Sequence, residues 1–293
     1  MGVAVDFLRR GFPNANSVWL DGTRPVLVDS GAPGGEAGLL AWLGVRVPRL
    51  LVNTHGHSDH AGGNGCLAGL GVPVAAEAAE AALVNAGDAD AGRAQWLRQH
   101  VPAYRVSRSL SAGEVIDTGD AAWRVVALPG HTAGQIGLFD PAARVLVAGD
   151  AVHGGDLGWL DLDADPCALD KAEATVEVIA GLAPRLLLSG HGAAVTDVDA
   201  ALAGARRRLA SWRAVPERIA WHACKRIFGH LLFTEGGLAR DRVAAALVEA
   251  PWFRDHAVRA FSVSPGAFVP MLVEEMLRSG AASWRGERLV PGG

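Results

Sequence analysis

The sequence is poor in cysteine and contains no long apolar segment. Its three cysteines, Cys66, Cys167 and Cys224, lie far apart and form no Cys-x-x-Cys pair. An odd and scattered set does not build a disulfide framework, so we interpret them as small, buried or half-buried apolar side chains and expect a reducing, cytoplasmic location. No uninterrupted apolar run is long enough to cross a bilayer, and the first residues lack the apolar core of a signal peptide. We therefore expect no membrane partner.

Basic residues are not in excess, and two common cofactor motifs are missing. The formal net charge is −4, which gives no electrostatic reason to expect nucleic acid as a partner. The chain has no Gly-x-Gly-x-x-Gly turn after a strand and no Gly-x-x-x-x-Gly-Lys-Ser/Thr loop, so hydride transfer and phosphate-loop chemistry are not indicated. Its 293 residues are enough for one large domain with a smaller appendage, and a small-molecule substrate fits this composition.

Short apolar runs alternate with helical patterns as far as Ala194. Two such runs around Asp21 and Gly22 predict a β-hairpin, and "PVAAEAAEAALV" predicts a strand followed by a helix. "DADPCALDKAEATVEVIAGL" predicts a helix capped by Asp165, with Pro166 at its first position. Later patterns are mostly helical. We therefore predict an α/β domain of residues 1–205 and a smaller, mostly helical domain of residues 206–293.

Four apolar runs share a pattern, because each begins with Arg and ends in a residue that can bind a metal. They are "RLLVNTH", "RVVALPGH", "RVLVAGD" and "RLLLSGH", which end at His55, His131, Asp150 and His191. Runs of this length bounded by Gly or Pro are typical of buried strands, and loops beyond strand ends hold ligands in layered α/β folds. If the four strands share a sheet, their ends could converge on one edge and form a site.

The first run leads into "THGHSDHAGG", which gathers further metal-binding side chains. His55 and His57 are two residues apart, so they point to the same side at the end of an extended strand. Asp59 and His60 follow as the chain turns and can face a neighbouring point. With the later runs, the candidate metal ligands are His55, His57, Asp59, His60, His131, Asp150 and His191. This set is too large for one catalytic zinc and suits two metals that share a carboxylate and a hydroxide.

The ordered motifs "THGHSDHAGG", "GHT", "AGD" and "SGHG" resemble the metallo-β-lactamase superfamily over roughly residues 12–195. The resemblance implies an αββα sandwich with a dinuclear site on one edge of its two sheets. It implies that His55, His57 and His131 hold the first metal. It implies that Asp59, His60 and His191 hold the second, and that Asp150 bridges the two. The implied cofactors are two divalent ions, zinc first, with manganese or iron as alternatives.

The resemblance also implies a reaction, the hydrolysis of a small ester, thioester or lactone by a hydroxide formed at the metals. Asp59 is the candidate catalytic residue, which would orient the nucleophile and carry its proton. A bridging Asp150 resembles the glyoxalase II, lactonase, thioesterase-like and nuclease branches rather than the true β-lactamases. The tail shows no clear basic and tyrosine set for glutathione. Its end, "LRSGAASWRGERLV", resembles the winged-helix appendage of the β-lactamase-like protein 2 group.

Two further residues are candidates for substrate contact. His153 lies three residues after Asp150, and Trp159 could form an apolar wall over the site, although a structural role is an equal alternative for each. The remaining histidines have no metal-binding partners at useful spacing, and we interpret them as structural or surface residues: His100, His222, His230 and His256.

Three other functions stay open. A mononuclear-iron persulfide dioxygenase would leave Asp59, His60 and His191 away from the metal. An RNA nuclease would use a basic patch such as "ARRRLASWR", although a solvated helix face is the simpler interpretation of that run. A non-catalytic binding protein would have empty or partial metal sites. The oligomeric state and the substrate stay undetermined.

Overall fold

The computed structural model describes residues 5–292, which divide into two compact units. The first unit contains the described residues up to Ala94 together with His100–Ala210, and the second contains Gln95–Gln99 and the described residues from Ser211 onward. The predicted boundary near residue 205 falls within helix α7 (Val198–Ala214). The division into independent domains at that position stays a prediction.

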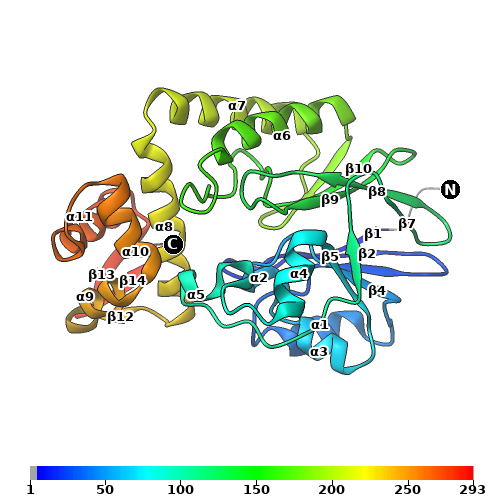
Figure 1. Ribbon diagram of the computed structural model, residues 1–293, viewed down its shortest axis with the longest axis horizontal. Coiled ribbons are helices and arrows are strands. Elements are labelled where there is room, and N and C mark those ends of the chain that lie inside the picture. Colours follow the sequence, from blue (N-terminus) through cyan, green and yellow to red (C-terminus); the bar gives the residue numbers. More distant parts are fainter. Residues whose placement is uncertain (1–4, 293) are drawn as a thin grey trace. The chain divides into compact units, whose positions relative to one another are not determined.

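Two β-sheets form the centre of the first unit (Figure 1). The strands of the six-stranded sheet are, in spatial order, β1 (Val5–Leu8), β2 (Ser17–Leu20), β3 (Val26–Val28), β4 (Leu50–Val52), β5 (Val74–Glu77) and β6 (Arg108–Leu110). The five-stranded sheet has the order β11-β10-β9-β8-β7, with β7 (Val115–Asp117), β8 (Ala122–Ala127), β9 (Ile136–Asp140), β10 (Val145–Gly149) and β11 (Leu186–Ser189). β2 and β3 pair antiparallel, which confirms the hairpin predicted around Asp21 and Gly22.

The two sheets pack face to face around a shared hydrophobic core. Successive side chains of a strand point to opposite faces, so a strand of this core can also contribute to a second layer. In β2, Val18 belongs to the hydrophobic core shared with Trp123 of the second sheet. Trp19, the next residue, belongs instead to a core on the other side of the first sheet, with Leu39 and Leu43. One strand therefore fills two hydrophobic layers, which is what a sheet covered on both faces requires.

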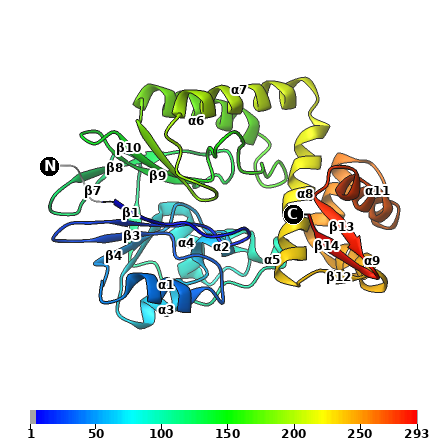
Figure 2. The same cartoon turned by 180° about the vertical axis from the view of Figure 1, so that it is seen from behind.

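Helices cover the outer face of each sheet, and this confirms the predicted αββα sandwich. The first sheet shares a hydrophobic core with α1 (Glu36–Leu43), α3 (Asn64–Gly69) and α4 (Ala78–Ala86). α6 (Ala168–Leu182) and α7 lie beside the second sheet in both views (Figures 1 and 2). The predicted start of α6 was wrong by two residues: Asp165 accepts a hydrogen bond from the Cys167 backbone N–H in a turn before the helix.

The four Arg-initiated runs do not share one sheet, so the condition stated for their convergence is not met. β4 lies in the first sheet, whereas β8, β10 and β11 lie in the second. β9 is antiparallel to both β8 and β10, and β10 is parallel to β11. The strands β8, β10 and β11 therefore run in the same direction. Their carboxyl ends meet at one edge of the sandwich, where the loop after β4 also arrives.

The second unit has four main helices and a small three-stranded sheet, whose order is β12-β14-β13. Its elements are α8 (Glu217–Thr234), β12 (Leu238–Ala239), α9 (Arg240–Glu249), α10 (Pro251–Asp255), the π-helical turn His256–Ala260, α11 (Pro265–Arg278), β13 (Ala282–Arg285) and β14 (Arg288–Pro291). A core of buried aromatic rings includes Trp252, Phe253 and Phe268. Helices followed by a β-hairpin are compatible with a winged helix, which stays a prediction. Across residues 5–292, no helix combines the length and hydropathy needed to span a membrane.

Candidate metal centre

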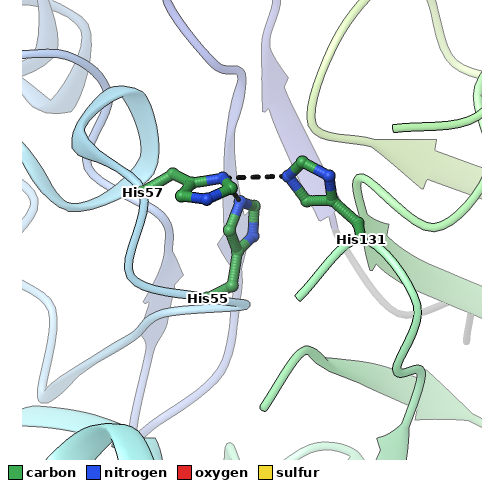
Figure 3. Close-up of side chains that lie close together, drawn as sticks. All are labelled: His55, His57 and His131. Atoms are coloured by element: carbon green, nitrogen blue, oxygen red, sulfur yellow. Dashed lines mark hydrogen bonds between the residues drawn. The ribbon is translucent and has the colours of Figure 1, made fainter. Parts of the chain in front are cut away.

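Three imidazole rings, two from the loop after β4 and one from the loop after β8, meet at one point (Figure 3). The Nδ1 atom of His57 lies 3.1 Å from Nε2 of His55 and 2.9 Å from Nε2 of His131. The chain is extended at His57 before the short helix α2 (Ser58–Ala61) begins, so His55 and His57 face the same point from one loop. Burial lowers the pKa of His55 and of His57 well below the ordinary value, and neighbouring imidazoles act in the same direction. These rings are therefore neutral at pH 7.

A backbone carbonyl fixes the orientation of the third ring. Nδ1 of His131 lies 2.6 Å from the carbonyl oxygen of Trp159, so that nitrogen donates and Nε2 keeps its lone pair for the cluster. Burial also lowers the pKa of His131, which favours the neutral ring. The loop that carries Trp159 thus sets the tautomer of a predicted metal ligand.

The second cluster joins α2 to the loop after β11. Nε2 of His191 lies 3.1 Å from Oδ2 of Asp59, and Nε2 of His60 lies 3.9 Å from the same oxygen. Burial lowers the pKa of His60, but the nearby carboxylates outweigh this, Asp29 most strongly, and the resulting pKa lies well above the ordinary value. The charge of these carboxylates makes the second cluster attractive to a cation.

Asp150, at the end of β10, stands between the two clusters. Its Oδ2 atom lies 3.8 Å from Nε2 of His131 and 3.5 Å from Nε2 of His191. Its Oδ1 atom lies 3.4 Å from Nε2 of His60. Burial raises the pKa of Asp150, but the imidazoles of His191 and His60 outweigh this and hold it well below the ordinary value. A carboxylate in this position can interact with both clusters at once.

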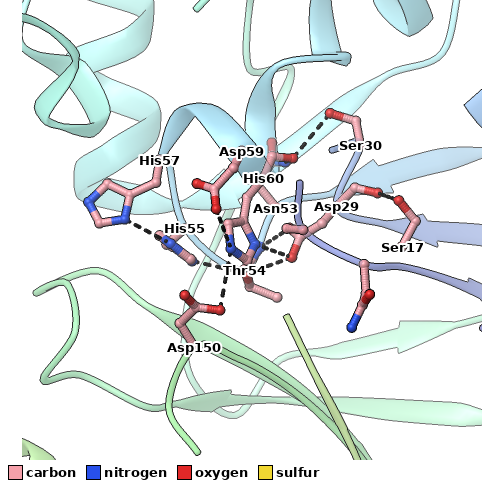
Figure 4. A network of polar contacts seen from close by, with 12 residues as sticks. Ser17, Asp29, Ser30, Asn53, Thr54, His55, His57, Asp59, His60 and Asp150 are labelled. Carbon is pink, nitrogen blue, oxygen red and sulfur yellow. Dashed lines mark hydrogen bonds and ion pairs between the residues drawn. The ribbon is translucent and has the colours of Figure 1, made fainter. Parts of the chain in front are cut away.

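A buried carboxylate beside His60 and Thr54, that of Asp29, was missed by the sequence prediction (Figure 4). Its Oδ2 atom lies 2.8 Å from Nδ1 of His60 and accepts a hydrogen bond from Oγ1 of Thr54, while Oδ1 accepts from the Thr54 backbone N–H. This contact directs Nε2 of His60 toward Asp59 and Asp150, as a carboxylate does for a metal-binding imidazole. The available signal was that the apolar run of β3 also ends in an acidic residue, in "VLVDSG".

The donor set fits divalent metal ions. Donors held 2.0–2.1 Å from a tetrahedral zinc lie about 3.3 Å apart, close to the 2.9 Å and 3.1 Å separations around His57. Nε2 of His60 is buried and makes no hydrogen bond, although its ring is held firmly from the other side. This buried nitrogen faces the carboxylates of Asp150 and Asp59, and a divalent cation bound among the three would satisfy them together.

Close backbone packing also holds the clusters, and two glycines make it possible. A Cβ atom on Gly158 would lie 2.8 Å from Cγ of His131, and one on Gly190 would lie 2.2 Å from Oδ1 of Asp150. Glu80, whose pKa burial raises to about 8, accepts a hydrogen bond from the backbone N–H of Gly56, between the first two histidines. None of these three residues was among the predicted site residues.

A Gly190→Ala substitution is expected to weaken metal binding. The new methyl group would also lie 2.5 Å from Cε1 of His60, so that ring and Asp150 would both have to move. We expect the affinity for a metal ion at the cluster of Asp59, His60 and His191 to fall by about 10-fold or more, as for other changes that displace metal-ligating groups. Competition with a chromophoric chelator measures it.

The matched control is Gly181→Ala inside α6, where nothing lies within 4 Å of the added methyl group. It should bind metal like the parent protein and gain about 0.5–1 kcal/mol of stability. Equal metal affinity in the Gly190 and Gly181 variants would contradict the packing argument.

The two predicted substrate contacts lie beside the clusters. The ring of Trp159 stacks on His57, with ring centroids 5.3 Å apart, and the ring of His153 lies 5.7 Å from that of His191. Among residues 5–292, the groups of side chains able to hold a metal include none of the other histidines. His256, for example, contacts the Trp252 carbonyl.

The αββα sandwich and its paired His/Asp clusters define a protein of the metallo-hydrolase class. A family model described as the metallo-beta-lactamase superfamily matches residues 10–191. The chain belongs to this superfamily.

Individual relatives are similar over parts of the chain. The acyl-coenzyme A thioesterase MBLAC2 of Gallus gallus is 36% identical over 129 residues, which cover 39% of this chain and 45% of the relative. A hydroxyacylglutathione hydrolase of Anaeromyxobacter dehalogenans is 34% identical over 214 residues, 70% of this chain and 74% of the relative. The match spans about half the length of the Gallus gallus thioesterase and of an uncharacterized protein of Aquifex aeolicus, which is 37% identical over 113 residues, 38% of this chain and 53% of that relative.

A solved structure described as TTHA1623 in a di-iron-bound form is also similar. Its TM-score is 0.54 at 27% identity, and the match covers 66% of this chain and 94% of that one. The match supports the fold of the part that carries the clusters.

Proposed function

We propose that the protein is a dinuclear, metal-dependent hydrolase of small acyl thioesters. The observation that carries the proposal is the position of Asp150, whose carboxylate faces both histidine clusters. The activities named for two relatives, a thioesterase and a hydroxyacylglutathione hydrolase, favour thioesters over the other esters and lactones that the sequence left open. Zinc as the metal and a cytoplasmic location stay predictions.

In this function, the histidine clusters would hold the ions that activate water and substrate. Bound divalent ions would lower the pKa of water toward neutrality and polarise an acyl carbonyl. His55, His57 and His131 are neutral nitrogen donors that are already oriented for one ion.

The carboxylates supply charge and a place for a proton. Asp150 faces both clusters, while Asp59 is the more accessible of the two, with 13% of its side chain exposed against 9% for Asp150. Asp59 is therefore proposed to hold the proton that leaves the nucleophile.

Two of the alternatives are less favoured by the geometry. A mononuclear iron site would leave Asp59, His60 and His191 unused, yet they form a group within 4.8 Å of one another. An RNA-binding patch on α7 would need free arginines, yet Arg206 and Arg208 pair with acidic residues of the same unit, Glu177 at 2.8 Å and Asp156 at 3.2 Å.

The test combines metal content with turnover. Protein purified without added metal is measured by mass spectrometry and assayed with acyl-coenzyme A, acylglutathione, simple ester and lactone substrates. We expect about two ions per chain, hydrolysis of a thioester, loss of activity with a chelator and recovery when metal is returned. One iron per chain with persulfide oxidation would overturn the proposal, as would a metal-loaded protein that hydrolyses none of these compounds.

A further inference from the structure

A short turn in the insertion before β6 contacts the loop that carries the first two histidines. In this turn, Ala91–Arg93, both Gly92 and Arg93 are in the left-handed region, with φ of 62° and 59°. That conformation is uncommon for arginine and persists where the surroundings require it. It brings Gly92 so close to Gly56 that a Cβ atom on Gly92 would lie 1.9 Å from the Gly56 carbonyl oxygen.

Gly56 is the residue between His55 and His57, so its peptide group sets the angle between the two rings. Its N–H group donates to Oε1 of Glu80 at 3.1 Å, and its carbonyl side is covered by Gly92. The histidine loop is thus held on both sides, once by α4 and once by the turn.

Arg93 extends from the same turn to the loop that orients His131. Its Nε atom lies 2.8 Å from Oδ2 of Asp161, whose other oxygen accepts from the backbone N–H groups of Asp163 and Ala164. The remaining guanidinium nitrogens contact the carboxylates of Asp90 at 2.9 Å and Asp163 at 3.3 Å.

These contacts lead to the first metal cluster, which consists of His55, His57 and His131. Asp161 follows Trp159 by two residues, and the Trp159 carbonyl accepts from Nδ1 of His131 while its ring stacks on His57. The guanidinium of Arg93 therefore connects the turn that packs on Gly56 to the loop that fixes the third ring.

We propose that Gly92 and Arg93 are positioning residues for the first metal cluster. They set the distance between the His55–His57 loop and the Trp159 loop, so that the three imidazole nitrogens meet at one point. This role rests on the proposed function only for its effect on turnover, because its effect on metal affinity is measured without any substrate.

A merely structural role predicts something different. The side chain of Arg93 is 23% exposed and that of Asp161 is 8% exposed, but without Arg93 the Asp161 carboxylate keeps the backbone N–H groups of Asp163 and Ala164 as donors. Loss of Arg93 should therefore change the metal site far more than the melting temperature.

The test follows cobalt(II) binding to the metal-free protein by visible absorption and by competition with a chelator. In Arg93→Ala, the affinity for the ion held by His55, His57 and His131 should fall by about 10- to 100-fold, as when outer partners of metal ligands are lost, and the absorption bands should shift. Arg93→Lys, with one ammonium in place of the planar fork, should recover only part of this loss. Asp161→Asn should match Arg93→Ala, and the double variant should be no worse than either single one.

The control is Arg24→Ala, which removes an exposed ion pair with Asp117 in the same unit. It should bind cobalt like the parent protein. Unchanged cobalt affinity and spectrum in both Arg93→Ala and Asp161→Asn would overturn the proposal. So would a loss of affinity that Asp161→Asn does not share, or one that only follows a lowered melting temperature. Failure to hydrolyse thioesters would refute the proposed function and leave the cobalt result standing.

Discussion

An Asp150→Asn variant is expected to bind fewer than two ions per chain and to lose activity by about 10³-fold or more, which corresponds to about 4 kcal/mol of activation free energy. The substitution keeps the size of the side chain and removes its negative charge. Oδ2 of Asp150 faces imidazoles of both clusters, so neither cluster keeps its shared anionic donor. Metal content and thioester turnover, measured on the same sample, check this expectation.

Asp140→Asn is the matched control for the loss of a buried carboxylate. Asp140 is as buried as a core residue, and its Oδ1 atom accepts from the backbone N–H groups of Ala142 and Ala143 in the turn after β9. An amide oxygen can make the same contacts, and within residues 5–292 no group of side chains able to hold a metal includes Asp140. Full occupancy by two ions in the Asp150 variant would refute the bridging role, whatever its activity.

An Asp29→Asn variant is expected to weaken metal binding by about 10- to 100-fold and to lower the free energy of unfolding by about 3–5 kcal/mol. The carboxylate of Asp29 serves three buried partners: the Thr54 backbone N–H, the Thr54 hydroxyl and Nδ1 of His60. An amide can replace one acceptor, but its NH₂ group cannot accept from the other two. Chemical denaturation and chelator competition measure the two effects.

Asparagine is the informative substitution because Asp29 has a φ of 57°, a conformation that asparagine tolerates and most other residues do not. Backbone strain is therefore not added to the loss of charge. An Asp29→Asn protein that unfolds like the parent and keeps its metal affinity would show that His60 is oriented by other contacts.

The sequence was most informative where several ligands lie in one segment. "THGHSDHAGG" places four candidate ligands next to one another, and local geometry alone predicts that His55 and His57 face one point. The ends of the other apolar runs also carried a signal, because a polar residue at the end of a buried strand has few structural roles. All seven predicted ligands lie in the two clusters or between them.

Among the supporting residues, only Asp29 shares this signal, because it follows the apolar run of β3. Asp29 and Glu80 contact the motif from 31 and 24 positions away in the chain, respectively. A carboxylate at such a separation looks like any surface acid until the fold buries it. Arg93 and Asp161 are 68 positions apart, and their pairing depends on two loops that only the packed sandwich brings together.

The sequence by itself determined the fold class and the candidate ligands, because hydrophobic periodicity and clustered side chains are local properties of the chain. The tertiary structure decided which sheet each Arg-initiated strand joins, which nitrogen of each imidazole faces the cluster, and which carboxylate holds His60. Those outcomes depend on burial and on contacts between distant segments. A single hydrogen bond, such as that from His131 to the Trp159 carbonyl, selects a tautomer that no pattern in the sequence encodes.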